Sequence, residues 1–367
     1  MPTTVAQNDA RGRGASRVAE IPRAGWKDIL WRTYNEVVND HVLLIAAGVT
    51  FYALLALVPA LTALVSIYGI FADPATLDRH MELLEGLIPS GGLDIVREQL
   101  RRLAEQGQTK LGLTSLLAFA IALWSANSGV KSMFEAMNVA YDEDEKRSYV
   151  RLTAVTMVFT LATFAAILLL IALIVVLPTV LQFVGLGTAA QWAARIGGLV
   201  LMVLLMVAGL AALYRFGPSR HAAQWRWITP GALVAILVIL ITSGLFTWYV
   251  ASFGSYDATY GSLGAIFGFM TWLWIAAIIV IVGAELNSEI EHQTKLDTTT
   301  GRPRPMGERG AVMADTIGLA HGDDGSDTRR GAEPRRSASE PLPLGRFALL
   351  AGLVWLRRRG GRGQPPA

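Results

Sequence analysis

Two long stretches of this chain contain no charged side chain, and they limit what it can fold into. Neither Val42–Phe71 nor Leu152–Ala194 contains an Asp, Glu, Lys or Arg residue. A helix needs about 20 predominantly apolar residues to cross the hydrocarbon core of a bilayer. Both stretches exceed that length, whereas roughly a quarter of the residues in a soluble domain are charged. The chain is therefore expected to be a multi-span membrane protein.

The composition agrees with this expectation and excludes several classes of protein. Hydrophobic residues make up 53% of the 367 residues and charged residues 17%. The sequence has no cysteine, which excludes disulfide bonds, cysteine-ligated zinc and thiol nucleophiles. A net charge of only +3 does not indicate a nucleic-acid-binding protein, because such proteins cluster Lys and Arg on one folded face. Nucleic acid is therefore not an expected partner.

The apolar stretches predict an all-α fold, a polytopic bundle of about six transmembrane helices. Gly185 and Gly187 separate the third stretch from the fourth, since glycine is a poor helix former. The six expected spans are Val42–Phe71, Leu111–Val130, Leu152–Phe183, Ala193–Phe216, Thr229–Phe253 and Ser262–Ala284.

Lys and Arg in the short loops predict the orientation of the bundle. They gather before the first span and in the loops after the second and fourth spans, whereas the loops after the third and fifth spans contain none. Because cytoplasmic loops carry the excess of Lys and Arg, both termini are expected in the cytoplasm. No apolar signal sequence precedes Val42, so the first span is expected to act as an uncleaved signal.

Three further segments flank or interrupt the membrane domain, which is expected to cover residues 42–292. Residues 1–41 are polar and predict a cytoplasmic N-terminal segment. Residues 72–110 carry two apolar stripes at helical spacing, which predict a periplasmic amphipathic hairpin, with a gate or a partner-docking surface as the alternative. Residues 293–367 are rich in Gly, Pro and Arg and predict a disordered cytoplasmic tail.

Uncharged polar residues in the first two spans are the first candidates for a functional site. Thr50 and Tyr52 lie in the cytoplasmic half of the first span, and Pro59 is expected to kink it because proline removes a backbone hydrogen bond. The second span ends in a polar cluster that contains Ser125, Asn127 and Ser128. Such groups bond across helices or line a polar cavity, and the sequence leaves both interpretations open.

The end of the chain's membrane domain supplies the remaining candidates. The loop before the last span contains Tyr256, Asp257, Tyr260 and Gly261. This composition fits either an interfacial aromatic belt or a glycine-rich backbone that dips into the bilayer. The last span ends in Glu285, Asn287 and Glu289. A solvated helix end is favoured there over a coupling carboxylate, and no ionisable group is expected at mid-membrane, which argues against simple proton coupling.

Four segments, in this order, resemble the YihY/BrkB family of bacterial inner-membrane proteins. They are Ala46–Pro59 (AAGVTFYALLALVP), Leu123–Tyr141 (LWSANSGVKSMFEAMNVAY), Leu213–Pro218 with Trp225–Gly231 (LYRFGP and WRWITPG), and Phe253–Glu291 (beginning FGSYDATYGSLG and ending GAELNSEIE). The resemblance covers about residues 25–292. It implies a six-span helical bundle in the bacterial inner membrane with both termini in the cytoplasm.

Members of this family have carried the label ribonuclease BN, and the sequence argues against that activity here. RNA hydrolysis needs an acid–base pair or a metal site. The five histidines have no metal-ligand spacing with one another, and the acidic run Asp142–Glu145 is expected to be a solvated loop. No catalytic residue, metal or cofactor is therefore predicted, and the chain is not expected to be an enzyme.

Two functions remain. The resemblance implies a role in handling envelope lipids, and the polar cluster and the Gly/Tyr loop suggest a transporter or flippase-like protein that moves a lipid or amphiphile through a groove. The alternative is a non-catalytic membrane scaffold for envelope assembly. Membrane lipids are the expected partners, and envelope proteins are further candidates.

Overall fold

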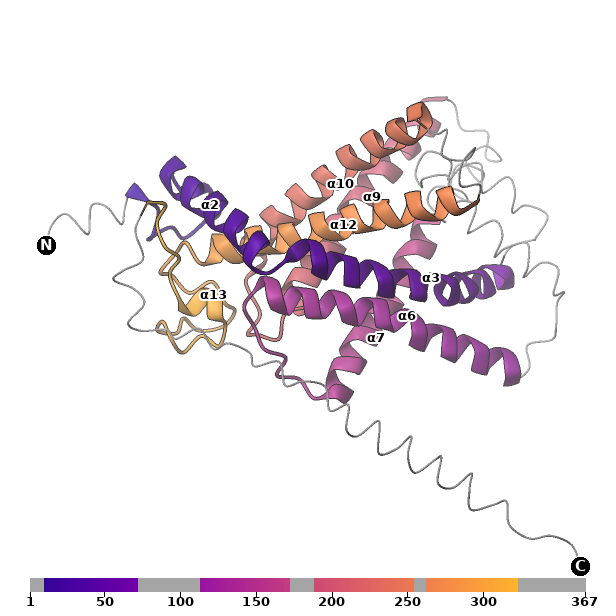
Figure 1. Ribbon diagram of the computed structural model, residues 1–367, viewed down its shortest axis with the longest axis horizontal. Helices are drawn as coiled ribbons and strands as arrows, with labels where there is room; N and C mark the ends of the chain where they lie inside the picture. The colour runs from indigo at the N-terminus through magenta and orange to yellow at the C-terminus, as the bar shows by residue number, and fades with distance from the viewer. Residues whose placement is uncertain (1–9, 72–112, 172–187, 254–261, 323–367) are drawn as a thin grey trace, which may run out of the picture. The chain divides into compact units, whose positions relative to one another are not determined.

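The computed structural model describes residues 10–71, 113–171, 188–253 and 262–322. Within these ranges the fold is all-α, as predicted, with one short 3-10 helix and eight α-helices (Figure 1). The elements are η1 (Val18–Glu20), α2 (Arg23–Asn39), α3 (Val42–Phe71), α6 (Leu113–Ala140), α7 (Tyr149–Ile171), α9 (Thr188–Phe216), α10 (Trp225–Phe253), α12 (Ser262–Glu291) and α13 (Val312–Asp315).

Each of the six expected spans lies on one of six long helices, α3, α6, α7, α9, α10 and α12. Five of these helices extend past the apolar stretches that predicted them. α6 continues to Ala140 and α12 to Glu291, whereas α7, α9 and α10 already begin at Tyr149, Thr188 and Trp225. The added turns of α6 and α12 contain polar residues that are buried inside the molecule, whereas a hydropathy pattern ends where the sequence becomes polar. Residues 111–112 and 172–183 of the expected spans, and the expected hairpin 72–110, lie outside the described residues.

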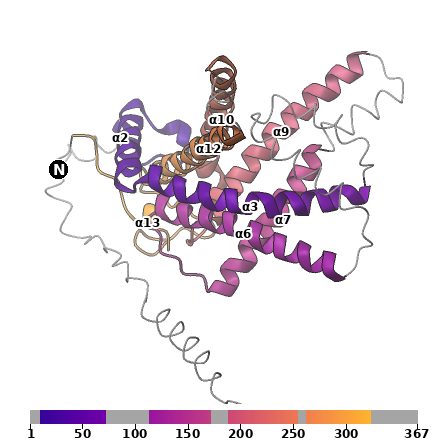
Figure 2. The same cartoon turned by 45° about the vertical axis from the view of Figure 1, so that its right-hand side comes forward.

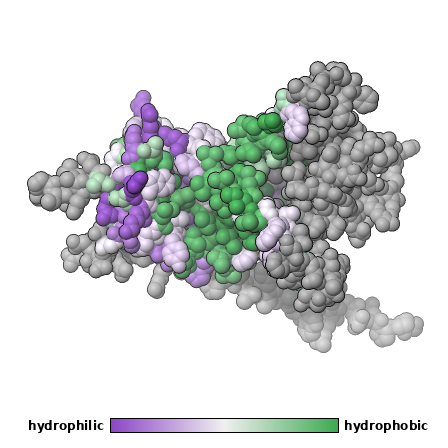
Figure 3. All heavy atoms as spheres, turned by 90° about the horizontal axis from the view of Figure 1, so that it is seen from above, coloured by the Kyte–Doolittle hydropathy of each residue, from purple (hydrophilic) through white to green (hydrophobic). Residues whose placement is uncertain are grey.

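Four helices, α7, α9, α10 and α12, are long and apolar enough to cross a membrane, and the bent pair of α2 and α3 is a fifth candidate. Only 11% of the most apolar stretch of α10 is buried within the molecule. A hydrophobic surface covers the middle of the described helices, and hydrophilic residues gather at the end where α2 lies (Figure 3). An exposed apolar surface this extensive is typical of contact with lipid.

Most of the buried apolar core lies at one end of the bundle. α3 packs along α6, and α12 packs against both α10 and α3 (Figures 1 and 2). The core side chains come from the start of α3 and α10 and from the last turns of α6, α9 and α12. Representative members are Val42, Met137, Tyr214, Ile228 and Ile281. We call this end of the bundle the α2 end, because α2 is docked there.

The helix pair α2 and α3 turns sharply where only Asp40 and His41 separate the two helices. The axes of α2 and the first part of α3 differ by 62°. His41 has a φ of 54°, in the left-handed region that residues other than glycine seldom adopt. Pro59 lies within α3, which continues as a helix to Phe71, and the kink expected there stays a prediction.

Residues 293–321 are folded onto the α2 end, so the prediction of a disordered tail beginning at residue 293 is wrong for this part of the chain. The Lys295 backbone N–H donates to the Arg13 carbonyl at 2.8 Å, and the Gly318 N–H donates to the His292 carbonyl at 3.0 Å. A polar sequence cannot build a core of its own. This one is ordered because it docks on α2 and the end of α12. Residues 323–367 of the expected tail lie outside the described residues.

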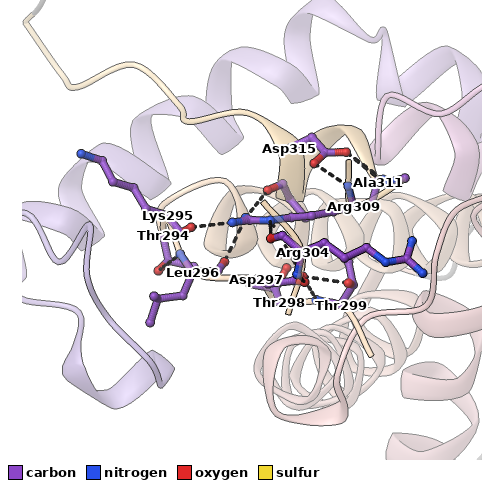
Figure 4. A network of polar contacts seen from close by, with 12 residues as sticks. Thr294, Lys295, Leu296, Asp297, Thr298, Thr299, Arg304, Arg309, Ala311 and Asp315 are labelled. Carbon is purple, nitrogen blue, oxygen red and sulfur yellow. Dashed lines mark hydrogen bonds and ion pairs between the residues drawn. The ribbon is translucent and has the colours of Figure 1, made fainter. Parts of the chain in front are cut away.

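In this docked segment, side chains hydrogen-bond to backbone groups that have no partner in a helix or a strand (Figure 4). The buried Arg309 guanidinium donates to the carbonyl oxygens of Lys295 at 2.7 Å and Ala314 at 2.6 Å. The Asp315 carboxylate accepts backbone N–H groups of Gly307 at 2.8 Å and Arg309 at 2.9 Å. Each polar residue therefore satisfies main-chain groups that would otherwise be unpaired, which explains how a glycine- and proline-rich segment holds one conformation.

Candidate functional site

A hollow of about 420 Å³ opens where α3, α6 and the first turn of α7 meet. Its walls combine apolar, hydroxyl and cationic side chains, and this size falls within the range of small-molecule sites. The lining residues are Leu55, Trp124, Ser125, Ser128, Lys131 and Tyr149.

Lys131 provides the positive charge of the hollow. Its Nζ donates to the Thr153 hydroxyl at 3.0 Å and lies 4.6 Å from the centre of the Tyr149 ring and 5.4 Å from that of Trp124. One hydrogen bond uses one of the three donors of an ammonium group. The cation is thus held in place by α7 and aromatic faces while facing a hollow that an anionic group could enter.

The polar cluster at the end of the second expected span divides into two parts. Ser125 and Ser128 line the hollow, and the Ser128 hydroxyl donates to the Ser125 carbonyl at 2.6 Å. Asn127 faces the other way: it is 1% exposed and its Oδ1 accepts a hydrogen bond from the Thr160 hydroxyl of α7 at 3.1 Å. The cavity-lining interpretation thus fits the two serines, and the packing interpretation fits Asn127.

The predicted residues of α3 do not line the hollow. Thr50 is buried and donates to the Ala46 carbonyl of its own helix at 2.7 Å, whereas Tyr52 is exposed and lies edge-on to Phe51. Leu55 represents α3 in the hollow instead. The remaining candidates of the Gly/Tyr loop, which are Tyr256, Asp257, Tyr260 and Gly261, lie outside the described residues.

The end of α12 is not a solvated helix end, so this prediction for Glu285 and Glu289 is wrong. Glu285, Asn287 and Glu289 are at most 1% exposed. The Asn287 amide donates to the Ile228 carbonyl and accepts the Gly231 N–H, both at 2.8 Å. It thereby bonds the first turns of α10 around Pro230, which has no N–H of its own to donate. Asn287 is a helix-to-helix bridge in this structure.

Two buried ion pairs surround the last turns of α12. The Arg32 guanidinium of α2 pairs with the Glu289 carboxylate and also donates to Gln293 Oε1 at 2.8 Å. Arg220 Nη2 and Nη1 donate to the two carboxylate oxygens of Glu291 at 2.6 and 3.1 Å. Both side chains of the Arg220 pair have 0% exposure. Charges buried this deeply are tolerated only when they are paired.

Asp142, Asp144 and Glu145 of the acidic run are exposed, as the sequence predicts, and only Glu143 is buried. Glu143 is 7% exposed, and its carboxylate accepts the Val312 N–H at 2.8 Å and the Lys146 ammonium at 2.6 Å. Desolvation raises the pKa of the Asp142 carboxyl above its usual range. The run therefore connects the end of α6 to the docked segment that follows α12.

The pKa of Glu145 is shifted in the opposite direction from that of Asp142, and this shift predicts how stability depends on pH. Partial burial raises the pKa of this carboxyl, but hydrogen bonds from Arg147 and Asn138 outweigh burial and lower the pKa to about 2. Because the folded pKa lies below the ordinary value of 4.5, Glu145 stabilises the fold fully above pH 4.5. That contribution is lost as the pH falls from 4.5 towards 2.

Thermal unfolding in detergent at several pH values measures this effect. E145Q should lower the Tm of the protein by a constant amount above pH 4.5, and the difference from the unsubstituted chain should shrink below that pH. A difference that stays the same down to the acid limit would contradict the role given to the Glu145 charge.

Among the described residues, no group of three or more His, Cys, Asp or Glu side chains is arranged to hold a metal ion. The Oε1 atom of Glu285 is buried and has no hydrogen-bond partner among the described residues. The hollow beside Lys131 is the candidate binding site of the described residues.

Lys131 is the residue of the candidate site that sequence reasoning missed, although the sequence contains a sign of it. Ser125, Ser128 and Lys131 recur at intervals of three, which places them on one face of a helix. Charge also marks the end of a span, and Lys131 was therefore assigned to the following loop. The helix instead continues to Ala140, so Lys131 lies inside it.

The chain is similar to several known proteins. A family model described as Virulence factor BrkB matches residues 33–307. The ribonuclease-like protein YfkH of Bacillus subtilis (strain 168) is 30% identical over 259 residues, which cover 68% of this chain and 90% of that protein. A UPF0761 membrane protein of Neisseria meningitidis serogroup B is 28% identical over 273 residues, which cover 71% of this chain and 63% of that protein.

A UPF0761 membrane protein of Rhodospirillum centenum is 28% identical over 291 residues, covering 77% of this chain and 60% of that protein. The matched part is thus less than two thirds of the length of the Neisseria and Rhodospirillum relatives. No solved structure matches the chain.

Proposed function

This chain belongs to the BrkB/YihY (UPF0761) family of multi-pass membrane proteins, and we propose that it is a transporter or flippase-like protein that moves an anionic lipid or amphiphile in the bacterial inner membrane. The observation that carries the proposal is the hollow beside Lys131. It offers a cation, two hydroxyls and an apolar wall within one small volume. Those are the groups that an anionic headgroup attached to an acyl chain would contact.

The substrate class follows from the arrangement of these groups. Phosphate and carboxylate headgroups accept charge-assisted hydrogen bonds from an ammonium, and Lys131 has donors left for them. Tyr149 begins α7 and is 66% exposed, as expected of a tyrosine at the membrane–water interface. A headgroup would therefore lie near Tyr149 and Lys131, and the acyl chain would contact Leu55 of α3.

The proposal includes six spans with both termini in the cytoplasm. Six long helices support it, and so does the contact between the two ends of the described chain. The Arg13 carbonyl accepts the Lys295 N–H, and the Arg13 guanidinium donates to the Gln293 carbonyl; both partners follow α12. An even number of crossings brings the segments before the first span and after the last to the same side. The excess of Lys and Arg in the short loops supports a cytoplasmic position for that side.

A non-catalytic scaffold is the second candidate, favoured by the ordered surface that residues 293–321 add to the α2 end. Neither candidate is an enzyme, and neither requires a cofactor, a metal or a nucleic acid. The two differ in one measurable respect, because a scaffold moves no lipid in vesicles that contain this protein alone.

Reconstitution into vesicles tests the proposed function. Vesicles containing the purified full chain and a fluorescent phosphatidylglycerol should move that lipid between leaflets, as measured by bleaching of the outer leaflet. K131M should reduce the rate about tenfold or more, because a hydrogen bond to a charged group contributes roughly 1.5–3 kcal/mol. K131R should retain most of the activity.

The matched control is K295M, which removes an exposed lysine outside the hollow. It should leave the rate unchanged. Equal rates for K131M and K295M in well-folded protein would refute the site. No lipid movement by the unsubstituted chain would favour the scaffold.

A further inference from the structure

One stripe of α2 is exposed along the whole helix. Arg23, Lys27, Leu30, Tyr34 and Val38 recur at intervals of four and three, so they share one face. Leu30 is 58% exposed, Tyr34 69% and Val38 57%. The two basic residues occupy the start of the stripe and the three apolar residues its second half.

The opposite face of α2 is fully engaged inside the molecule. Gly25, Asp28, Ile29, Arg32 and Thr33 are buried there. Asp28 accepts hydrogen bonds from Arg11 at 2.8 Å and from the His321 N–H at 2.9 Å, while Arg32 pairs with Glu289 of α12. These contacts hold α2 in one rotation about its axis, so the exposed stripe is presented in a fixed direction.

The next helix along the chain, α3, also has exposed apolar side chains. Beyond the bend at His41, the exposed side chains include Leu43, Leu44 and Phe51. α3 is part of a candidate membrane span. α2 itself carries Asp28, Arg32 and Glu36 within its 17 residues, which does not suit a helix that crosses the hydrocarbon core.

We propose that the exposed stripe of α2 rests on the membrane surface, with Leu30, Tyr34 and Val38 inserted shallowly beside α3 and with Arg23 and Lys27 on anionic phospholipid headgroups. A helix that is basic and apolar along one face and lies next to a span is suited to this position. Basic residues close to an anionic leaflet are attracted to its headgroups. The inference does not depend on whether the protein moves lipid.

The lack of cysteine in the chain makes a direct test available, because one introduced cysteine carries a single label. Y34C with an environment-sensitive fluorophore, reconstituted in vesicles containing phosphatidylglycerol, should show blue-shifted emission. Spin-labelled lipid should quench the label more strongly than aqueous iodide does. Tm measurements on each labelled protein establish that it is folded.

Two matched positions calibrate the measurement. L237C lies on the exposed face of α10, within a candidate span, and should report lipid. K295C is exposed in the docked segment and should report water. If Y34C behaves as K295C does, the stripe faces water and the proposal is wrong. If neither quencher reaches Y34C, protein covers the stripe, for example a second copy, and the proposal is also wrong.

Charge is tested separately on the same label. Substituting R23Q and K27Q together in labelled Y34C should weaken quenching by spin-labelled lipid in phosphatidylglycerol vesicles and change it little in phosphatidylcholine vesicles. An equal response in both kinds of vesicle would overturn the assignment to anionic headgroups.

Discussion

R220M should lower the free energy of unfolding by about 3–5 kcal/mol, the usual effect of removing one partner of a buried ion pair. The Arg220 guanidinium donates to both oxygens of Glu291 and lies 4.1 Å from the centre of the Tyr141 ring. Neither charged side chain reaches solvent. Methionine fills much of the same volume but leaves the Glu291 charge without a counter-charge, because its other described partner is the neutral Thr298 hydroxyl at 2.9 Å.

Unfolding of the purified chain in mixed micelles, followed by tryptophan fluorescence, measures this effect. The double variant R220M/E291L removes both charges and should be clearly less destabilised than R220M alone. R226M changes an exposed arginine near the same loop and should alter the free energy by no more than about 0.5 kcal/mol. Equal losses in the single and double variants would show that the packing of Arg220, not its charge, stabilises this end.

The helices could be predicted from the sequence because each depends on a local property. Runs of apolar residues such as Val42–Phe71 identify a span without knowledge of its neighbours, and α3 has those bounds. The continuations of α6 and α12 could not be predicted in this way. Their polar turns are helical because distant residues satisfy them, such as Arg32, which lies 257 positions from Glu289 in the chain.

The candidate site was predicted only in part, because some of its features are local in sequence and others depend on distant residues. Ser125 and Ser128 were recognised as polar groups on an apolar helix, because such a face is visible locally, but the sequence left open whether they pack or line the hollow that they do line. The direction of Asn127 depends on Thr160 of α7, and the burial of Glu285 depends on the fold of the α2 end. A single sequence contains the residues of these contacts but not their pairing.

G231A is expected to separate α10 from α12 where Gly231 lies against Gly283 and Asn287. A Cβ on Gly231 would overlap the Gly283 carbonyl oxygen and lie 2.5 Å from the Asn287 side chain. The carbonyl belongs to the helix backbone and cannot rotate away, so one helix must shift. Overpacking of this kind destabilises by about 1–3 kcal/mol. Displacing the Asn287 amide would add about 1–3 kcal/mol for each buried group left unpaired.

The same helix provides the control. Gly244 of α10 has no atom within 4 Å of the position that a Cβ would take. G244A should therefore stabilise the chain by about 0.5–1 kcal/mol, because alanine favours a helix over glycine. The identical chemical change thus has opposite expected signs at two positions that lie between three and four turns apart in one helix. If both variants are stabilised to the same extent in unfolding titrations, then α10 and α12 do not depend on the Gly231–Gly283 contact, and Asn287 does not bridge them.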